Sequence, residues 1–420
     1  MTAAIHLYRN LTRAAAPFLG GVLKHRARAG KEDYGRINER LARNLPRRMP
    51  GGTLVWLHGA SVGESQLLLE LGQRLLDIRP DLLLLFTSQT QTSARLIGPA
   101  LPDRAIHLMA PLDTPGIARR FIRHWQPDLC IFGEGEFWPN LILEAERAGA
   151  RRALVNGRMT DSSATGWQKL SGAFQRLVGR FDVVLAADTD TARRLESLLG
   201  RPVPSTGNMK SALPPPSASE VETRRLREGF LGDRRCILAA STHEGEEALF
   251  LDALKGADDT ALIIAPRHPD RGDDVEALLR ARGLPFARRS RGEVPTPRTR
   301  VLLADTMGEM GLWYRLADSV FLGGGHTPGV GGHNPLEPVR LGRPVVTGPD
   351  VFNFATMMDS LEKQGLIRRL KTPKAIGKAL MTMAAPTENA LSALAQEADA
   401  PMTLTLEALL PLLPEPGLLQ

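Results

Sequence analysis

The apolar run "LVWLHGASVGES", residues 54–65, ends in a loop with two residues that could do chemistry, Ser61 and Glu64. Gly59 to Gly63 fit the pattern G-x-S-x-G, which places a nucleophilic serine on a strand-to-helix turn. Glu64 offers a different chemistry, because a carboxylate held at such a turn can remove the proton of an attacking hydroxyl. A third interpretation is structural, since the helix dipole favours an acidic residue in the first turn.

A serine hydrolase would need an acid and then a histidine later in the chain. The candidate histidines all follow a proline-rich segment in the second half of the chain: His243, His268, His326 and His333. The serine also follows the first predicted strand, whereas a hydrolase elbow lies well inside one large sheet. We therefore favour Glu64 as the reactive residue and keep Ser61 and Gly63 as further candidates.

Two more loops of the first half carry charged residues at predicted strand ends. "FGEGEFWPN", residues 132–140, contains Glu134 and Glu136, and "STGNMKSA", residues 205–212, contains Lys210. A carboxylate can stabilise positive charge at a reacting carbon, and an ammonium group can stabilise a departing phosphate. Which of the two glutamates acts stays open.

Asp188 and Asp190 match the D-x-D pattern of metal-dependent sugar transferases. The surrounding "VLAADTDTARRLESL" is more simply a strand followed by a helix N-cap and an acidic first turn. The chain contains no His/Cys cluster either. We expect no metal and no cofactor.

The loops of the second half predict a nucleotide site. Glycine density lets the backbone approach a ligand closely, and a helix start can hold a phosphate. Glu337, just inside a helix, could accept hydrogen bonds from two ribose hydroxyls. The candidate residues are Ser241, Thr242, Pro266, Arg267, His268, Met307, Gly308, Glu309, Asn334, Pro335, Leu336 and Glu337.

The elements that must position these loops alternate short apolar strands with amphipathic helices, which predicts two doubly wound α/β domains facing each other across a cleft. Continuous apolar runs predict buried parallel strands at 53–58, 82–87, 129–133, 153–157, 182–187, 236–241, 261–266, 300–305, 319–325 and 343–348. The expected divisions are an N-terminal segment 1–50, a Rossmann-like acceptor domain 51–211, a linker 212–225, a donor domain 226–385 and a helical tail 386–420.

The net charge of +7 comes from the N-terminus, because residues 1–50 contain 11 Lys or Arg and 3 Asp or Glu, a balance of +8. Apolar residues accompany these cations, and the cations interrupt any stretch long enough to span a bilayer. Such a segment suits the surface of an anionic membrane, although it could also pack on its own domain. The two cysteines, Cys130 and Cys236, fit no metal or redox spacing and indicate a reducing compartment.

The chain resembles the 3-deoxy-D-manno-octulosonic acid (Kdo) transferases of bacterial lipopolysaccharide synthesis, through "HGASVGE", "FTSQTQTSARL", "EFWPN", "NGRMTDSS", "APRHPDR", "DTMGEMGLWY" and "GGHNPLEP". The resemblance implies the two-domain GT-B fold and transfer of Kdo from CMP-Kdo to a lipid A precursor at the cytoplasmic face of the inner membrane. It also implies that Glu64 accepts the proton, that Lys210 and an acid of "GEGE" assist, and that the loops at 266–267, 307–309 and 334–337 contact CMP. The family often begins with a more continuous hydrophobic anchor, so a peripheral attachment is expected here.

Other functions remain open on the residues alone. A sugar-nucleotide epimerase, a transferase using another nucleotide sugar and a regulator that binds a nucleotide without turnover would share the fold. Nucleic-acid binding is disfavoured, because the N-terminal cations lack interleaved base-stacking aromatic residues.

Overall fold

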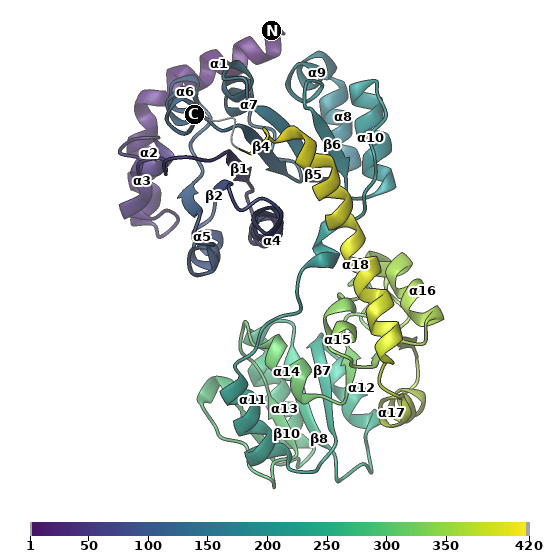
Figure 1. The fold of residues 1–420 in the computed structure, drawn as a ribbon. Coiled ribbons are helices and arrows are strands. Elements are labelled where there is room, and N and C mark those ends of the chain that lie inside the picture. Colours follow the sequence, from purple (N-terminus) through teal and green to yellow (C-terminus); the bar gives the residue numbers. More distant parts are fainter. Residues whose placement is uncertain (1, 417–420) are drawn as a thin grey trace. The chain divides into compact units, whose positions relative to one another are not determined.

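The computed structural model describes residues 2–416, which form two compact units, 2–213 with 398–416 (unit 1) and Pro214–Glu397 (unit 2). Each unit contains a parallel sheet with helices on both faces (Figure 1). The two doubly wound sheets confirm the predicted fold class.

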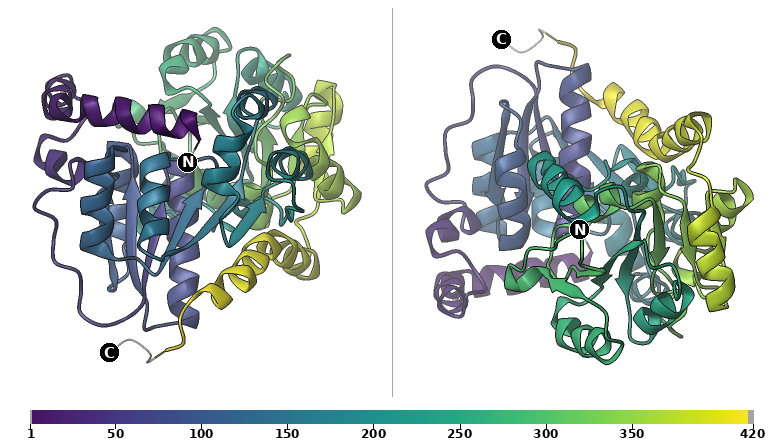
Figure 2. Two further views of the ribbon diagram at one scale, coloured as in Figure 1. Left: turned by 90° about the horizontal axis from the view of Figure 1, so that it is seen from above. Right: turned by 90° about the horizontal axis from the view of Figure 1, so that it is seen from below.

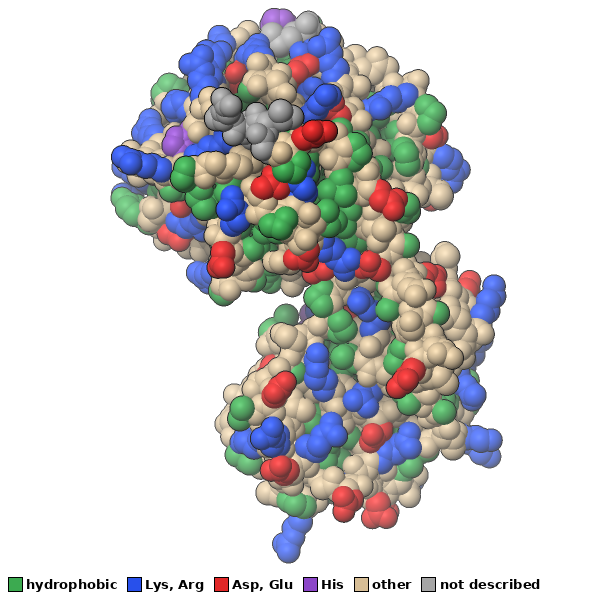
Figure 3. All heavy atoms as spheres, viewed as in Figure 1, with side chains coloured by type: hydrophobic (Ala, Val, Ile, Leu, Met, Phe, Trp, Pro, Cys, Tyr) green, Lys and Arg blue, Asp and Glu red, His purple; other side chains and the backbone are tan. Residues whose placement is uncertain are grey.

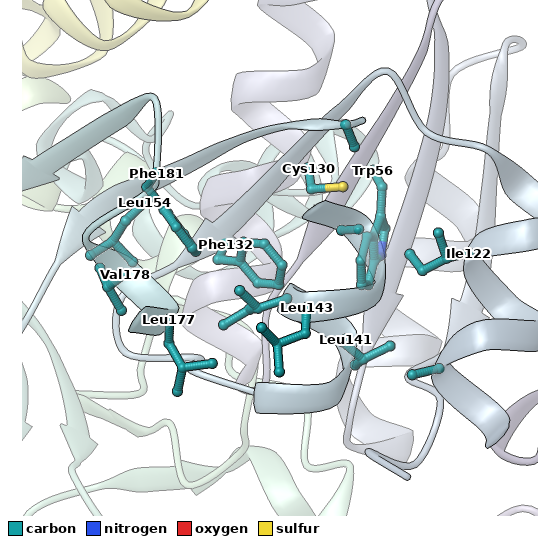
Figure 4. Packing of buried hydrophobic residues seen from close by; sticks show 14 of the residues in the cluster. Trp56, Ile122, Cys130, Phe132, Leu141, Leu143, Leu154, Leu177, Val178 and Phe181 are labelled. Atoms are coloured by element: carbon teal, nitrogen blue, oxygen red, sulfur yellow. The ribbon is translucent and has the colours of Figure 1, made fainter. Parts of the chain in front are cut away.

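The sheet of unit 1 has the order β3-β2-β1-β4-β5-β6. Its strands are β1 (Leu54–His58), β2 (Leu83–Ser88), β3 (Ala105–Met109), β4 (Leu129–Gly133), β5 (Arg151–Gly157) and β6 (Val183–Ala186). The helices that follow these strands are α4 (Val62–Ile78), α5 (Gln91–Ile97), α6 (Pro115–Trp125), α7 (Pro139–Arg147), α8 (Asp161–Gln168), α9 (Ser171–Val178) and α10 (Thr189–Leu199). Between one sheet face and its helices, Trp56 and Phe132 pack against Leu141 and Leu143 of α7 (Figure 4).

The sheet of unit 2 has the order β13-β12-β11-β7-β8-β10-β9. Its strands are β7 (Cys236–Thr242), β8 (Ala261–Pro266), β9 (Phe286–Arg288), β10 (Val301–Leu303), β11 (Ser319–Leu322), β12 (Val345–Thr347) and β13 (Ile367–Arg369). Its helices are α11 (Glu220–Leu226), α12 (Glu246–Ala253), α13 (Gly272–Ala281), α14 (Met310–Leu316), α15 (Leu336–Arg340), α16 (Ala355–Lys363) and α17 (Pro373–Thr382).

Strands β3, β9 and β13, which the apolar runs did not predict, lie at sheet edges. An edge strand is less enclosed than a central one and tolerates polar residues, such as exposed Arg368 in β13. In β3, His107 is buried but forms a hydrogen bond with Ser88. The central strands were found because both of their faces are buried.

The division into units differs from the expected segments. The N-terminal helices α1 (Ala3–Ala15), α2 (Leu19–Arg28) and α3 (Ile37–Arg40) belong to unit 1 instead of forming a separate segment. The expected linker contains most of α11, and α18 (Glu388–Leu409) begins in unit 2 and ends in unit 1. The tail expected at 386–420 is therefore shared between the units.

Helix α1 lies on the outer side of α6 and α7, across one helical layer of unit 1 (Figure 2). The Tyr8 hydroxyl donates a 2.9 Å hydrogen bond to Asp113, and Arg9 pairs with Glu144 at 3.4 Å. Arg9 is thus a buried structural cation of unit 1. Within residues 2–416, no helix has the length and hydropathy needed to cross a membrane.

Candidate active site

The loops that follow β1 and β4 meet in unit 1, because these strands are neighbours while their helices pack on opposite faces of the sheet. Ligands of open α/β sheets bind at this switch point, beyond the carboxyl ends of the strands. The first loop carries Ser61 and Glu64, and the second carries Glu134 and Glu136. The sheet order therefore brings together side chains that are about 70 residues apart in the chain.

Glu64 is buried, and its carboxylate is oriented by its own loop. One oxygen accepts the backbone N–H of Ala60 at 3.0 Å, and the other accepts the Ser61 hydroxyl at 2.7 Å. The Ser61 oxygen in turn accepts the backbone N–H of Glu64 at 3.3 Å. This reciprocal pair satisfies two groups at the start of α4 and holds the carboxylate in one orientation.

Ser61 is consequently a helix cap. Its hydroxyl both donates to and accepts from Glu64, and no described histidine hydrogen-bonds to it. The elbow pattern in the sequence arises from this cap, so the geometry does not support a serine hydrolase.

Two glycines lie beside the Glu64 carboxylate. A Cβ added to Gly59 would lie 3.6 Å from one carboxylate oxygen, and a Cβ added to Gly133 would lie 3.7 Å from the same atom. Both glycines belong to the loops that meet at the switch point. Glycine at these two positions keeps that side of the carboxylate free of neighbouring side chains.

Glu134 pairs with Lys210 at 2.5 Å and accepts a 3.3 Å hydrogen bond from the Asn156 amide. Asn156 also accepts the backbone N–H of Met209 at 2.9 Å and so holds the loop that carries Lys210. Both Glu134 and Asn156 have positive φ, +48° and +51°, which costs energy for residues other than glycine. Both of these strained residues help to hold Lys210 in place.

Lys210 also lies against the start of α4, since a Cβ added to Gly63 would be 3.4 Å from its ammonium nitrogen. The structure thus brings Lys210 and Glu134 to the helix turn that contains Glu64. The family resemblance named Lys210, Glu64 and an acid of "GEGE" together, but the sequence pattern alone did not show that they meet, because Lys210 follows β6, which lies at the far edge of the sheet.

Glu136 occupies a separate hydrogen-bond network. It accepts from the Trp138 indole at 2.6 Å and from the Gln89 amide at 3.1 Å, and the His58 Nε2 lies 3.7 Å away. Burial acts to raise the pKa of Glu136, but His58, Trp138 and Gln89 together lower it below its usual value. Of the two glutamates in "GEGE", Glu134 is therefore the one beside Lys210.

In unit 2, the loops after β7 and β11 meet at the corresponding switch point. Buried Glu246 joins them, because its carboxylate accepts three backbone N–H groups, from His243 at 2.9 Å, Gly324 at 2.8 Å and His326 at 3.0 Å. Glu246 thus fixes the glycine-rich loop, and the sequence patterns did not identify it as a site residue. Its position in the first turn of α12, shortly after "STH", could have indicated this role.

Three histidines line this region. His243 and His333 share a 2.8 Å contact between their Nε2 atoms, and the His268 ring lies 6.0 Å from that of His243. Burial, with the charges of His243, Arg267 and His268, lowers the pKa of His333 to about 4. The contact at neutral pH is therefore a hydrogen bond in which one ring donates and the other accepts.

The predicted nucleotide contacts lie at the end of β7 and on the loops after β8, β10 and β11. Arg267 and His268 are exposed, whereas Pro266 and Thr242 are buried, and the Thr242 hydroxyl donates to Glu247 at 2.7 Å. Ser241 has a φ of +54° at the end of β7. Arg267 and His268 are thus free to meet a ligand, while Thr242 has a structural bond.

The Met307 side chain is exposed, and Gly308 has a φ of +83°. The carboxylate of Glu309 pairs with Arg289 at 2.6 Å and accepts the Thr306 hydroxyl; the bond from Arg289 lowers the pKa of Glu309. Because the Glu309 carboxylate already binds Arg289 and Thr306, a ligand would contact the backbone of Glu309 instead.

In the last loop, Asn334 caps α15 by accepting the Leu336 N–H at 3.0 Å, and Pro335 and Leu336 are buried. Glu337 is half-buried, and burial raises the pKa of its carboxyl. Tyr314 lies close enough for the Glu337 charge to raise the pKa of its hydroxyl further, after burial itself. Burial is the cause of the pKa shift of Glu337, and its carboxylate oxygens are acceptors that a ligand could use.

The D-x-D pair is structural. Asp188 is the N-cap of α10 and accepts the Thr191 N–H at 2.7 Å, and Asp190 pairs with Arg193. Among the described residues, no group of three or more His, Cys, Asp or Glu side chains could hold a metal ion.

Residues 32–213 match the family described as 3-deoxy-D-manno-octulosonic-acid transferase (kdotransferase). A 3-deoxy-D-manno-octulosonic acid transferase of Rickettsia bellii is 33% identical over 351 residues, which cover 83% of each chain. The chain belongs to the 3-deoxy-D-manno-octulosonic acid transferase family. Relatives of the same description from Haemophilus influenzae and Bordetella pertussis are 34% and 35% identical, over 78% and 79% of this chain and 78% and 80% of theirs.

Two solved structures are similar to parts of this Kdo transferase family member. A UDP-N-acetylglucosamine 2-epimerase is 13% identical, with a TM-score of 0.52 over 86% of this chain and 96% of that one. The C-terminal CMP-Kdo binding domain of WaaA from Acinetobacter baumannii is 31% identical over 45% of this chain and 97% of that domain, with a TM-score of 0.37. The chain thus has the GT-B fold of two Rossmann-like units, which glycosyltransferases and epimerases share.

Proposed function

We propose that this glycosyltransferase moves Kdo from CMP-Kdo to a lipid A precursor, tetraacyldisaccharide bisphosphate, with inversion at the anomeric carbon. The observation that carries the proposal is the buried, oriented Glu64 carboxylate with the Lys210–Glu134 pair at the same helix turn. Family membership supports Kdo as the transferred sugar.

In the proposed reaction, Glu64 accepts the proton of an acceptor hydroxyl as its oxygen attacks the anomeric carbon of Kdo. The bond from that carbon to the CMP phosphate breaks, and its electron pair leaves with the phosphate oxygen. Glu134 stabilises positive charge that develops on the sugar, and Lys210 supports the negative charge of the leaving group. Attack opposite the leaving group inverts the configuration, and no metal or cofactor takes part in these steps.

Unit 2 would hold the donor. Arg267 and His268 are exposed beside the loops joined by Glu246, where they can meet the phosphate. The backbones of Met307, Gly308 and Glu309 would contact the nucleotide, with Ser241 nearby. Asn334 to Glu337 would hold the ribose, with the Glu337 carboxylate on its two hydroxyls.

We also propose that the chain works at the cytoplasmic face of the inner membrane, held peripherally by α1 and α2. Four large apolar side chains of these helices are exposed: Leu7, Leu11, Phe18 and Val22. Exposed Arg13, Lys24 and Arg28 accompany them. Apolar side chains that enter the interface beside cations are typical of a helix that lies on an anionic bilayer.

Product analysis tests the proposed function. Purified protein is incubated with CMP-Kdo and the tetraacylated lipid A precursor, and the products are identified by mass spectrometry. We expect one or more Kdo additions to the lipid and release of CMP. Release of CMP without a gain of mass on the lipid would exclude this acceptor, and turnover of a UDP-sugar instead would favour an epimerase.

A further inference from the structure

The groove between α6 and α7 contains a cavity of about 490 Å³ on the outer side of that helical layer. Its lining residues are Arg119, Ile122, Arg123, Glu144, Arg147 and Ala148. The cavity lies toward the C-terminal ends of both helices. Because α6 and α7 run back from the carboxyl edge of a parallel sheet, this is the end opposite to Glu64.

Cations outnumber anions at this cavity. Buried Glu144 is the acidic residue, and it pairs with Arg147 at 2.6 Å, Arg9 at 3.4 Å and Arg119 at 3.5 Å. The side chain of Arg123 has no hydrogen bond or ion pair to any residue in the described part of the chain. Four arginines against one carboxylate leave a local charge of +3.

Helix α1 presents apolar side chains next to this cavity. Ile5 and Arg9, one turn apart, are buried against unit 1, whereas Leu7 and Leu11 are 61% and 62% exposed. At 3.6 residues per turn these two pairs lie on opposite sides of the helix. The docked side of α1 therefore reaches Glu144 while its other side offers leucines to the surroundings. In Figure 3, Lys and Arg side chains gather over the part of unit 1 where Figure 1 draws α1, α2 and α6.

We propose that the α6–α7 cavity binds the phosphate of an anionic glycerophospholipid headgroup when α1 lies on the membrane. This inference rests on the membrane attachment proposed above and names its ligand. Arginine is suited to bind phosphate, because its planar guanidinium group can donate two parallel hydrogen bonds to phosphate oxygens. Glu144 already orients two of the arginines that line the cavity, Arg119 and Arg147. The position of the cavity, away from Glu64, favours a bulk lipid over the phosphates of the acceptor.

Vesicle binding tests the site with the full-length protein. The double variant Arg123→Gln with Arg147→Gln removes two cavity cations and leaves Glu144 paired with Arg9 and Arg119. Lys169→Gln with Arg193→Gln removes the same charge from exposed positions around α8 to α10 and serves as the matched control. The vesicles are phosphatidylcholine mixed with phosphatidylglycerol, or phosphatidylcholine mixed with oleate at the same surface potential.

On phosphatidylglycerol vesicles we expect the cavity variant to partition about 25-fold more weakly than wild type, which corresponds to two cations at about 1 kcal/mol each. The control variant should stay within about twofold of wild type, since its cations lie elsewhere. On oleate vesicles the cavity variant should lose much less. Unchanged thermal unfolding shows that the variant is folded, and Arg123→Gln alone gives a second test, because Arg123 has no described partner.

Three results would overturn the inference. Equal losses on both kinds of vesicle would mean that general charge acts instead of a phosphate site. A raised KM for detergent-dispersed acceptor, with unchanged vesicle binding, would assign the cavity to the acceptor. If wild-type protein binds no vesicle while it transfers Kdo normally, membrane attachment itself fails and the enzymatic proposal stands.

Discussion

Glu64 has two roles at the level of a single residue. Its backbone N–H and carboxylate complete a reciprocal cap with Ser61, and the same contacts orient the carboxylate that we propose as the base. The Glu64 carboxylate is thus oriented by contacts within the first turn of its own helix and the preceding loop. This arrangement makes the two roles separable by substitution.

Glu64→Gln should reduce transfer by several orders of magnitude, because the amide cannot accept the hydroxyl proton. Glutamine also forms capping boxes, so the fold should be retained. Ser61→Ala, the control, removes the cap and should cost about 1 kcal/mol of stability with a much smaller loss of rate. Rates from CMP release and unfolding by circular dichroism measure both effects. Full activity of Glu64→Gln would exclude Glu64 as the base.

Glu337 illustrates the cost of a ligand-binding carboxylate. Burial raises the pKa of the Glu337 carboxyl, so the folded protein binds the carboxyl proton more tightly than the unfolded chain does. The ionised carboxylate therefore destabilises the folded state once the pH rises above the pKa that Glu337 has in the unfolded chain. Glu337→Gln should therefore stabilise the free protein at neutral pH and raise its Tm by roughly 2–4 °C for each kcal/mol gained. The gain should vanish in acid.

The same substitution should weaken CMP binding, because each hydrogen bond to a charged acceptor contributes roughly 1.5–3 kcal/mol. Calorimetry with CMP measures the loss, and thermal scans at neutral and acidic pH measure the stability. Unchanged CMP affinity would remove the ribose role, whatever the Tm.

At the level of an element, α1 is docked by polar contacts on one side and bears apolar residues on the other. The docking contacts are those of Tyr8 to Asp113 and Arg9 to Glu144, both within the helical layer of unit 1. Burial raises the pKa of Tyr8, and the charge of Asp113 raises it further, so the tyrosine stays protonated and can donate. Polar docking leaves the leucines of α1 free for another surface.

Arg9→Ala should destabilise unit 1 by roughly 1.5–3 kcal/mol, because it removes a buried charged hydrogen bond, although Glu144 keeps Arg119 and Arg147 as partners. Arg13→Ala, one turn further along α1, should change stability by less than about 0.5 kcal/mol, since Arg13 is exposed. Urea unfolding of both variants gives the comparison. Equal stabilities would show that the Arg9–Glu144 pair does not hold the helix.

On the scale of the whole molecule, the two units divide the proposed task. Unit 1 contains the Glu64 cluster and the N-terminal helices, and unit 2 contains the loops joined by Glu246. A water-soluble nucleotide sugar and a lipid acceptor pose different binding problems. We therefore assign the membrane contact to the unit that would bind the lipid.

Replacing Arg13, Lys24 and Arg28 with glutamine should release the protein from anionic vesicles, with a loss of about 3 kcal/mol for three cations. High salt should have a similar effect, since it screens the attraction. Transfer to detergent-dispersed acceptor should be unaffected, because these residues are far in sequence from the loops of the candidate site. Cosedimentation and the transfer assay are the measurements. Wild-type protein that resists high salt and carbonate and needs detergent for release would instead be integrally anchored.

The sequence by itself determined the two α/β units, most of their central strands and the loops that carry the candidate residues. These features are local, because a strand buried on both faces must be continuously apolar and a loop is recognised by its glycines and polar residues. It also favoured Glu64 over Ser61 before the cap between them was visible.

Only the tertiary structure decided which side chains meet. Strand order places the Glu134 loop beside Glu64, and Asn156 holds the Lys210 loop against Glu134, although these residues are far apart in the chain. The structure also showed that Arg9 and Arg40 are buried among the N-terminal cations, and it selected Glu134 over Glu136 as the neighbour of Lys210. The physical reason is that burial and ion pairing depend on long-range packing. The sequence does not show whether a charged residue is solvated by water or paired with a buried carboxylate.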